Sequence, residues 1–507
     1  MTCFRAGLCL ALLVLGGATL FARGGSQGGG GQVKNLTALV PNSASDMNDP
    51  RANPVYTFIN DATGYHITYD PLPQDQPLNK LNAIVASGAA EYDFIVLAGG
   101  WKDRYAEYAI QGALFDIGSV FQNYKNLQAI PQTLIDVVKV NNTFYTIPSL
   151  SPAGREESAN ADSFLLWRTD ILAAMGRRMP TTLDEFTGLL QAYKDQDPMR
   201  NGSANVPLTG TIGDLNNFRT SAIGGAFGIE LNWRDQGGAL VPFQTQTGFF
   251  EFLQYLHELY ARGLLDPELP TNNAAAVREK FTTNKALVRA DGWWDIPGLV
   301  ATFKQVYPQA AMEFSQPLER NGMAGAQANS KNQIDLFCVI PRNARNWQST
   351  MDFFNKKMDP AVFKEMVIGK EGIDHTVNAR GGFDPILPTF FDNRGNANWY
   401  LTGTPIEYNQ YWLCRAKKDD DQYKVYAQVN YDYGRFIHVN PASDVPCTTF
   451  VSIAAANGLS SSITDEFMVN SVVNGLTRAQ FNAFVADWKA QCGDALIAAY
   501  NGWYQNR

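Results

Sequence analysis

The sequence predicts an α/β protein with two large lobes, in which helices flank the sheets. Short apolar runs typical of buried strands alternate with amphipathic stretches that have the 3.6-residue period of a helix. At 507 residues the chain is too long for one simple hydrophobic core. Strands that alternate with helices indicate βαβ units, and therefore mostly parallel sheets.

The amino terminus has the pattern of an export signal followed by a linker. Residues 1–22 carry Arg5 near their start, then an apolar stretch and the small Ala22, which is typical of a secretory signal rather than a membrane span. The glycine-rich residues 23–32 have the composition of a flexible linker. We therefore expect an exported protein of the periplasm or cell envelope. A membrane tether stays open, because Arg23 stands where a bacterial lipoprotein would carry its lipidated cysteine.

Composition and charge argue against several classes of function. The net charge is −8 and no basic stripe is present, so we expect no nucleic-acid partner. No apolar run after the predicted signal has the length of a transmembrane helix. The histidines are scattered and the later cysteines lack the C-x-x-C spacing of a zinc or redox site, so we expect no cofactor. Disulfides are permitted outside the cell, and their pairing stays open among Cys338, Cys414, Cys447 and Cys492.

The first hundred residues predict three strands separated by helices. The strand candidates are residues 36–40, 65–69 and 92–98. The helix candidates are residues 55–62 and 78–85, each with apolar positions on one face.

Polar and aromatic side chains follow two of these strands. Trp101, Asp103 and Arg104 come directly after the third strand and a pair of glycines, where a helix opens. Open α/β sheets bind ligands at the carboxyl ends of their strands, which makes these residues candidates for a binding site. Asn42 and Ser43 follow the first strand and are candidates for the same reason. The alternative for Asp103 and Arg104 is a solvated helix start.

A second stretch repeats this arrangement. Residues 286–290 form an apolar run that suits a strand covered on both faces, and Asp291 begins a turn. Trp293 and Trp294 follow the turn, and Asp295 offers an N-cap for the next helix. Both indoles could belong to the core. Because adjacent residues tend to point to different sides, we expect at least one indole to face a cleft.

Residues 281–294 read F-T-T-N-K-A-L-V-R-A-D-G-W-W. They resemble the F-x-x-G-K-A-A-M-x-x-x-G-x-W signature of extracellular solute-binding proteins of carbohydrate ABC importers, in the oligosaccharide-binding, lipoprotein-like branch. Residues 93–117 resemble the maltodextrin-type pattern of that family, in which a Trp and an Asp-Arg pair contact sugar from the amino-terminal lobe. The resemblance implies a type II periplasmic binding protein fold, with two lobes joined by a hinge.

A loop at residues 197–207 resembles the calcium loop of the oligosaccharide-binding branch. That loop mimics an EF-hand, with oxygen ligands at alternate positions. Asp197, Asn201 and Asn205 remain here, but Met199 replaces a ligand and one residue is missing. We therefore expect a degenerate loop that forms a polar turn without metal.

The rest of the chain supplies elements for both lobes. Predicted strands lie at residues 163–167 and 333–340, and predicted helices at residues 183–193, 246–262, 351–368 (broken at Asp359-Pro360) and 477–504. A capping box, Thr182 with Glu185, starts the first of these helices. The resemblance implies that residues 33–155 and about 330–380 form lobe 1. Lobe 2 and the hinge then take residues 156–329 and part of 381–507.

These patterns favour a monomeric binding protein that captures an oligosaccharide in an aromatic-lined cleft between the lobes. The resemblance implies that it delivers the sugar to ABC permease subunits. Indole faces suit the apolar faces of pyranose rings, and carboxylates, amides and guanidinium groups suit hydroxyls.

Two other functions stay open. An exported glycoside hydrolase or lyase would need two carboxylates on either side of a bond, such as Asp103 with Asp291 or Asp295. No catalytic motif marks these residues, so we expect no enzyme. A sensory binding protein would serve a receptor instead of a permease.

Overall fold

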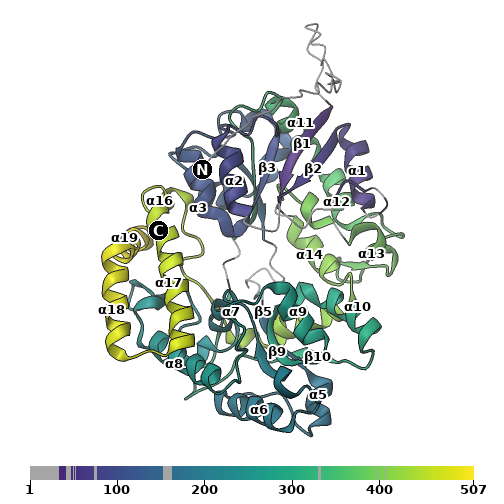
Figure 1. Ribbon diagram of the computed structural model, residues 1–507. Helices are drawn as coiled ribbons and strands as arrows, with labels where there is room; N and C mark the ends of the chain where they lie inside the picture. Colours follow the sequence, from purple (N-terminus) through teal and green to yellow (C-terminus); the bar gives the residue numbers. More distant parts are fainter. Residues whose placement is uncertain are drawn as a thin grey trace, which may run out of the picture.

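The computed structural model describes residues 34–41, 47–49, 51, 53–72, 77–151, 161, 163–328, 330, 333–395, 397–405 and 407–507. The predicted signal and linker, and the candidates Asn42 and Ser43, lie outside the described residues. The chain forms two lobes, one above the other in Figure 1, and each is built around its own sheet. The expected two-lobed α/β fold is confirmed.

Lobe 1 begins with the alternation that the sequence predicts. Strands β1 (Asn35–Val40), β2 (His66–Pro71) and β3 (Phe94–Ala98) pair in parallel, with β1 between the other two. Helices α1 (Pro54–Thr63) and α2 (Pro77–Ala86) connect them. Each end of these five elements lies within two residues of the predicted end.

The lobe 1 sheet is completed by a strand that comes from far along the chain. Strand β12 (Ile334–Val339) lies between β3 and β4 (Thr146–Leu150) and is antiparallel to both. A strand that arrives from the other lobe enters the sheet at the edge where β3 and β4 end, and so it runs against them. The sheet is therefore mixed, where mostly parallel pairing was expected.

Helices after β12 extend lobe 1. The predicted pair is present as α11 (Trp347–Lys357) and α12 (Pro360–Ile368), and Asp359 caps the second helix. Helices α11, α12 and α13 pack against α1, and α14 packs against α12, so this stretch of lobe 1 continues past residue 380. The other elements of lobe 1 are η1 (Gly99–Trp101), α3 (Lys102–Ile110), η2 (Phe121–Asn123), η3 (Lys125–Ala129), α4 (Gln132–Val138), β13 (His375–Val377), β14 (Phe383–Pro385), α13 (Thr389–Arg394), η8 (Ala397–Tyr400) and α14 (Tyr408–Ala416).

Lobe 2 holds the second mixed sheet, in the order β10-β5-β9-β6. Its centre is β9 (Ala286–Gly292), which is antiparallel to β5 (Ser163–Arg168) and parallel to β6 (Val206–Thr209). The edge strand β10 (Met312–Phe314) pairs with β5. Strand β9 continues through Asp291, where the sequence predicted a turn, because Ser163 and the following β5 residues supply pairing partners up to its end.

Several helices pack against the strands of this sheet. The predicted capping box is present, since the Glu185 N–H donates to Thr182 Oγ1 over 3.2 Å at the start of α6. The remaining elements of lobe 2 are α5 (Thr169–Ala174), α6 (Leu183–Gln196), η4 (Gly202–Ala204), α7 (Asp214–Ser221), η5 (Gly224–Phe227), β7 (Trp233–Asp235), β8 (Leu240–Pro242), η6 (Phe243–Thr245), α8 (Thr247–Ala261), α9 (Ala274–Thr282), η7 (Trp293–Asp295), α10 (Ile296–Val306), β11 (Ala326–Ala328), α15 (Asp420–Ala427), η9 (Gln428–Asp432), η10 (Gly434–Phe436) and β15 (Ile437–Val439).

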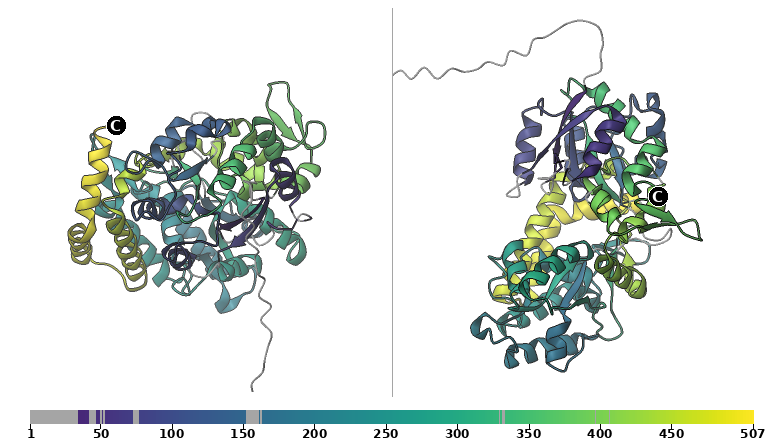
Figure 2. Two further views of the ribbon diagram at one scale, coloured as in Figure 1. Left: turned by 90° about the horizontal axis from the view of Figure 1, so that it is seen from above. Right: turned by 90° about the vertical axis from the view of Figure 1, so that its right-hand side faces the viewer.

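The carboxyl-terminal helices lie along one side of the molecule, drawn in yellow in Figures 1 and 2. The long helix α17 (Ala454–Asn474) packs against α8 of lobe 2 and α3 of lobe 1, and so bridges the lobes. The predicted helix over 477–504 is present, but a π turn interrupts it next to the buried Trp488. These elements are α16 (Cys447–Phe450), α17, α18 (Arg478–Trp488), η11 (Lys489–Gly493) and α19 (Asp494–Tyr504).

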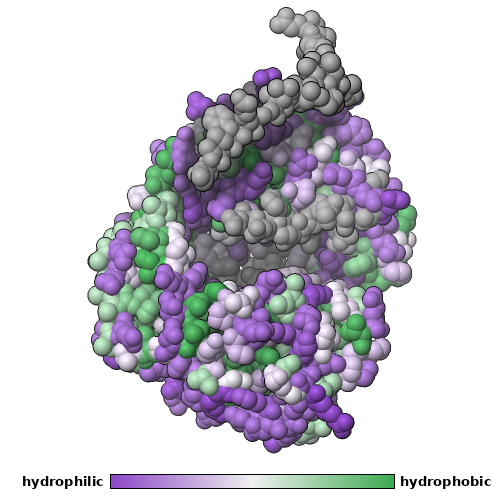
Figure 3. All heavy atoms as spheres, viewed as in Figure 1, coloured by the Kyte–Doolittle hydropathy of each residue, from purple (hydrophilic) through white to green (hydrophobic). Residues whose placement is uncertain are grey.

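The face shown in Figure 3 is mostly hydrophilic, with hydrophobic residues scattered over it. Among the described residues, none of the helices combines the length and the apolar character that a bilayer span requires.

The later cysteines do not pair with one another. Cys338, Cys414, Cys447 and Cys492 are all buried and free. Burial raises the pKa of each thiol, which keeps the reactive thiolate scarce at neutral pH.

We predict that a reducing agent leaves the stability of the protein unchanged. Thermal unfolding with and without dithiothreitol should give the same midpoint, because no disulfide joins these four thiols. A midpoint several degrees lower in the reductant would contradict the free cysteines.

Candidate functional site

The ends of β3 and β9 lie beside the segments that connect the lobes. Ala98, the last residue of β3, pairs with Leu336, close to the point where the chain enters lobe 1. Gly292, the last residue of β9, pairs with Ser163, where the chain has just entered lobe 2. The two stretches that the sequence singled out are therefore both at lobe connections.

Close packing fixes the turn after β3. A Cβ atom on Gly99 would lie 2.2 Å from the Ile334 carbonyl oxygen, so only glycine fits there. The Ser151 N–H donates to the Gln333 carbonyl oxygen over 2.9 Å, which joins the two connecting segments. Trp101 follows this turn and packs, partly buried, against the core of lobe 1.

Asp103 and Arg104 make local contacts at the start of α3. Asp103 Oδ1 accepts the Arg104 backbone N–H over 2.8 Å, and the Arg104 guanidinium donates to Glu107 over 2.6 Å. The Arg104 guanidinium also lies against Gly458 of α17, since its Nη2 would be 3.2 Å from a Cβ atom added to that glycine. Arg104 thus faces the bridging helix, and both side chains remain partly exposed.

The two adjacent indoles of lobe 2 have different surroundings. Trp293 is only 8% exposed and packs edge-on against Tyr426 and Trp412, with ring centroids 5.0 and 5.8 Å away. Because Trp412 belongs to α14, this cluster joins lobe 2 to the helices of lobe 1. Trp294 is 51% exposed and its six-membered ring covers Gly292. Trp294 therefore offers a free aromatic surface at the end of β9.

Asp291 is buried next to these indoles. Its carboxylate lies 3.1 Å from the Arg289 guanidinium, but burial outweighs this partner and raises the pKa of Asp291 to about 7. Asp295 lies 3.5 Å from the Arg278 guanidinium and 4.0 Å from that of Arg289. Asp295 occupies the N-cap position of α10, as predicted, but its side chain makes no capping hydrogen bond and faces these arginines instead.

Asp335 is a candidate that sequence reasoning missed. It is the second residue of β12, beside the Gly99 turn, and its side chain is exposed. The surrounding protein nevertheless raises the pKa of Asp335 to about 6 by desolvation. The sequence does contain a signal for Asp335, because it is a single acidic residue within a mostly apolar predicted strand.

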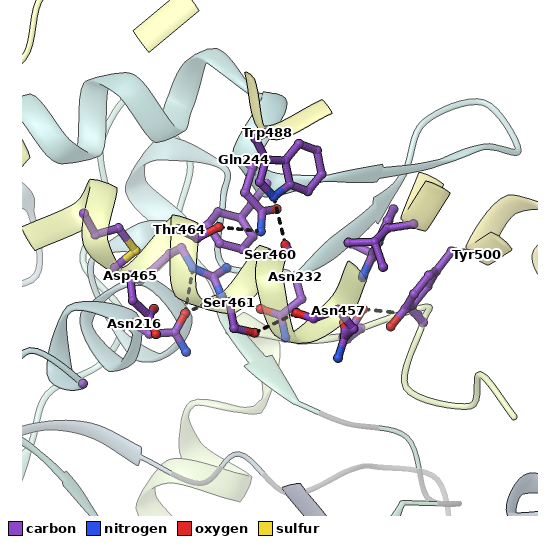
Figure 4. Close-up of a pocket in the computed structure, with 18 residues that line it drawn as sticks. Asn216, Asn232, Gln244, Asn457, Ser460, Ser461, Thr464, Asp465, Trp488 and Tyr500 are labelled. Atoms are coloured by element: carbon purple, nitrogen blue, oxygen red, sulfur yellow. Dashed lines mark hydrogen bonds between the residues drawn. The ribbon is translucent and has the colours of Figure 1, made fainter. Parts of the chain in front are cut away.

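A second group of polar residues lines a pocket of about 480 Å³ in lobe 2. One side of the pocket is a single face of α17, and the other is formed by α7, η6, β7 and the last two helices. Asn440 and Ala442 bring in the segment that leads from β15 back toward lobe 1. Figure 4 labels the polar and aromatic members Asn216, Asn232, Gln244, Asn457, Ser460, Ser461, Thr464, Asp465, Trp488 and Tyr500.

The interior of this pocket is rich in amides and hydroxyls. Gln244 donates to Thr464 Oγ1 over 3.4 Å, and the Trp488 indole N–H donates to Ser460 Oγ over 2.9 Å (Figure 4). The Tyr500 ring stacks on Trp233 at 4.3 Å, and burial, with a smaller effect of Asp103, raises the pKa of Tyr500. Aromatic walls with a few oriented polar groups are typical of small-molecule sites. The residues from α17 recur with the spacing of one helix face, whereas the others come from distant segments that no local pattern connects.

The degenerate calcium loop is held by its own hydrogen bonds. Asp197 Oδ1 and Oδ2 accept the N–H groups of Asn201 and Gly202, each over 2.8 Å. The Asn201 and Asn205 amides donate to carbonyl oxygens outside the loop, over 2.7 and 3.1 Å. Within the described ranges, no group of three or more His, Cys, Asp or Glu side chains could hold a metal ion.

The sequence matches a family described as "Bacterial extracellular solute-binding protein" over residues 44–333, more than half of the chain. The chain belongs to this family. This solute-binding protein is 22% identical to the polygalacturonan/rhamnogalacturonan-binding protein YtcQ of Bacillus subtilis, over 83% of its own length and 82% of the relative. It is 25% identical to lipoprotein LipO of the same species, over 56% of its length and 55% of the relative.

Solved structures share the fold of this solute-binding protein along most of both chains. The substrate-binding protein FusA of Streptococcus pneumoniae, in complex with kestose, has a TM-score of 0.70 and 16% identity, and the match covers 93% of this chain and 99% of that one. The alginate-binding protein AlgQ2, solved without calcium ion, has a TM-score of 0.67 and 15% identity, with 93% and 98% coverage. Both similarities show a common fold.

We predict opposite behaviour for the two adjacent indoles of this solute-binding protein. Trp293→Ala should lower the free energy of unfolding by about 3–5 kcal/mol, because it leaves a cavity in a packed aromatic cluster. Trp294→Ala removes a half-exposed ring and should cost less than about 1 kcal/mol. Urea unfolding without ligand measures both values. Equal losses would show that both rings are structural.

We also predict that Asp291 makes the stability depend on pH. Between about pH 4 and pH 7 the folded protein keeps a proton on Asp291 that the unfolded chain has released, since its folded pKa is raised to about 7. The free energy of unfolding should therefore fall as pH rises through this range, and Asp291→Asn should flatten that fall. Urea unfolding at pH 5 and pH 8 tests this, with the exposed Asp184→Asn as a control. An unchanged slope in Asp291→Asn would refute the assignment.

Proposed function

We propose that this protein is an exported binding protein that captures an oligosaccharide between its lobes and delivers it to an ABC permease. The observation that carries this proposal is the position of two indole-bearing strand ends, those of Trp101 and Trp294, beside the connections between the lobes. Similar proteins are named for polygalacturonan/rhamnogalacturonan and fructooligosaccharide, which supports a carbohydrate ligand.

The geometry suggests how such a ligand would be held. The exposed face of Trp294 can stack on a sugar ring, while Asp335 and the amides of the α17 pocket can bond its hydroxyls. Closure of two lobes about their connecting segments would then exclude water from the sugar. In this proposal Trp101, Asp103, Arg104 and Asp291 belong to the site or its edge, together with Asn42 and Ser43. Trp293 supports the ring beside it.

We infer a binding role without catalysis. A glycoside hydrolase needs one free carboxylate and one proton donor on opposite sides of the bond. Of the acids considered for that role, Asp295 lies against Arg278 and Asp103 accepts a backbone N–H, while Asp291 is buried beside Arg289. A sensory role for the same cleft would differ only in the receiving partner. We propose a monomer for either role, with lobe 1 formed by residues 33–155 and about 330–416.

We predict that the protein binds an oligosaccharide stoichiometrically and releases it unchanged. Calorimetry against an oligosaccharide library should identify a ligand, and mass spectrometry after prolonged incubation should return it intact. Steady production of shorter sugars would instead indicate a hydrolase or lyase.

With that ligand, Trp101→Ala and Trp294→Ala should each weaken binding by roughly thirtyfold or more, the usual cost of truncating a buried aromatic anchor, about 2–4 kcal/mol. Trp503→Ala on α19 serves as the control for loss of a partly exposed indole elsewhere. Normal affinity in both cleft variants would show that the proposed site is wrong.

A further inference from the structure

The described cations around the lobe connections and the α17 pocket are already engaged. Arg104 pairs with Glu107, Arg289 lies against Asp291, and the Lys102 ammonium donates to the Val445 carbonyl oxygen. Each of these groups thus already has a partner within the protein.

Arg219 is the one cation among the residues that line the α17 pocket in the part of the chain described. It is fully buried, and its guanidinium donates to Asn216 Oδ1 over 2.7 Å and to the Ile229 carbonyl oxygen over 2.8 Å. It also stacks on the Phe243 ring at 3.7 Å. These contacts hold the guanidinium within lobe 2, where it supports the wall of the pocket.

Two carboxylates in the same region are free. Asp335, beside the lobe connection, and Asp465, in the α17 pocket, are exposed and make no hydrogen bond or ion pair with any described residue. Partial desolvation by the surrounding protein raises the pKa of both carboxyl groups. Water and a ligand are the partners left for these oxygens.

We propose that the cleft takes a neutral, hydroxyl-rich oligosaccharide and rejects chains of uronic acids, with Asp335 and Asp465 as the residues that discriminate. This rests on the proposed function. A carboxylate accepts hydrogen bonds from sugar hydroxyls, whereas it repels the carboxylate of a uronate. Specificity of this kind comes from a repulsive element as well as an attractive one. The inference separates this protein from similar ones that are named for polygalacturonan/rhamnogalacturonan and for alginate.

The test uses pairs of oligosaccharides that differ only in the oxidation state at C6, such as an oligogalacturonate and the same chain after carboxyl reduction. Calorimetry at pH 8 keeps both aspartates ionised. In every pair of which at least one member binds measurably, the neutral oligosaccharide should bind about tenfold more tightly than the acidic one at low salt. The acidic oligosaccharide brings its carboxylates close to those of the protein, and like charges repel. Added salt should narrow this difference, since it screens the repulsion.

Asp335→Asn and Asp465→Asn keep the shape of the side chains and remove their charge. Each should bring the affinities of the acidic and neutral members closer together, whereas Asp184→Asn, on the exposed surface of α6, should leave the ratio unchanged. Tighter binding of the acidic members by the unmodified protein, or an unchanged ratio in both cleft variants, would overturn this inference and leave carbohydrate capture intact. Absence of binding to every oligosaccharide would overturn the proposed function and this inference with it.

Discussion

The arrangement of the molecule depends on the insertion of β12 between β3 and β4. The chain leaves lobe 2 and enters the sheet of lobe 1 as this strand, so the sheet of lobe 1 is complete only when the chain has returned from lobe 2. The contact is tight enough that Gly99 has no room for a side chain beside Ile334. The same contact places the turn that carries Trp101, and the carboxyl group of Asp335, next to the lobe connection. A structural constraint thus positions the residues that we assign to ligand binding.

The carboxyl-terminal helices add a second connection between the lobes. Helix α17 packs against α3 at one end and against α8 at the other, and one of its faces lines the polar pocket. Arg104 touches this helix at Gly458, and Lys102 bonds to Val445 just before α16. Helix α17 is therefore in contact with both lobes and with the pocket at the same time.

Sequence patterns were most reliable where one segment contains its own signal. The capping box of Thr182 and Glu185 and the apolar run of β9 are local features, and the structure has both. Patterns failed where a distant partner decides the outcome. Asp295 has the residue type and place of an N-cap, but Arg278 and Arg289 from neighbouring elements bind its carboxylate. The direction of β12 was likewise beyond local periodicity, since it depends on the edge at which the chain enters the sheet.

By itself, the sequence determined the alternation of strands and helices, the two-lobed α/β class and the two turns that carry indoles. These follow from residue spacing, which sets the local conformation and the buried face of each element. Only the tertiary structure decided that Trp293 is packed and Trp294 is exposed. Other elements, such as α14 with Trp412, cover the first indole and leave the second one open to solvent. It also assembled the α17 pocket and brought Asp335 to the lobe connection. Such sites are built from segments far apart in the chain, and no spacing within one segment records which of them will meet.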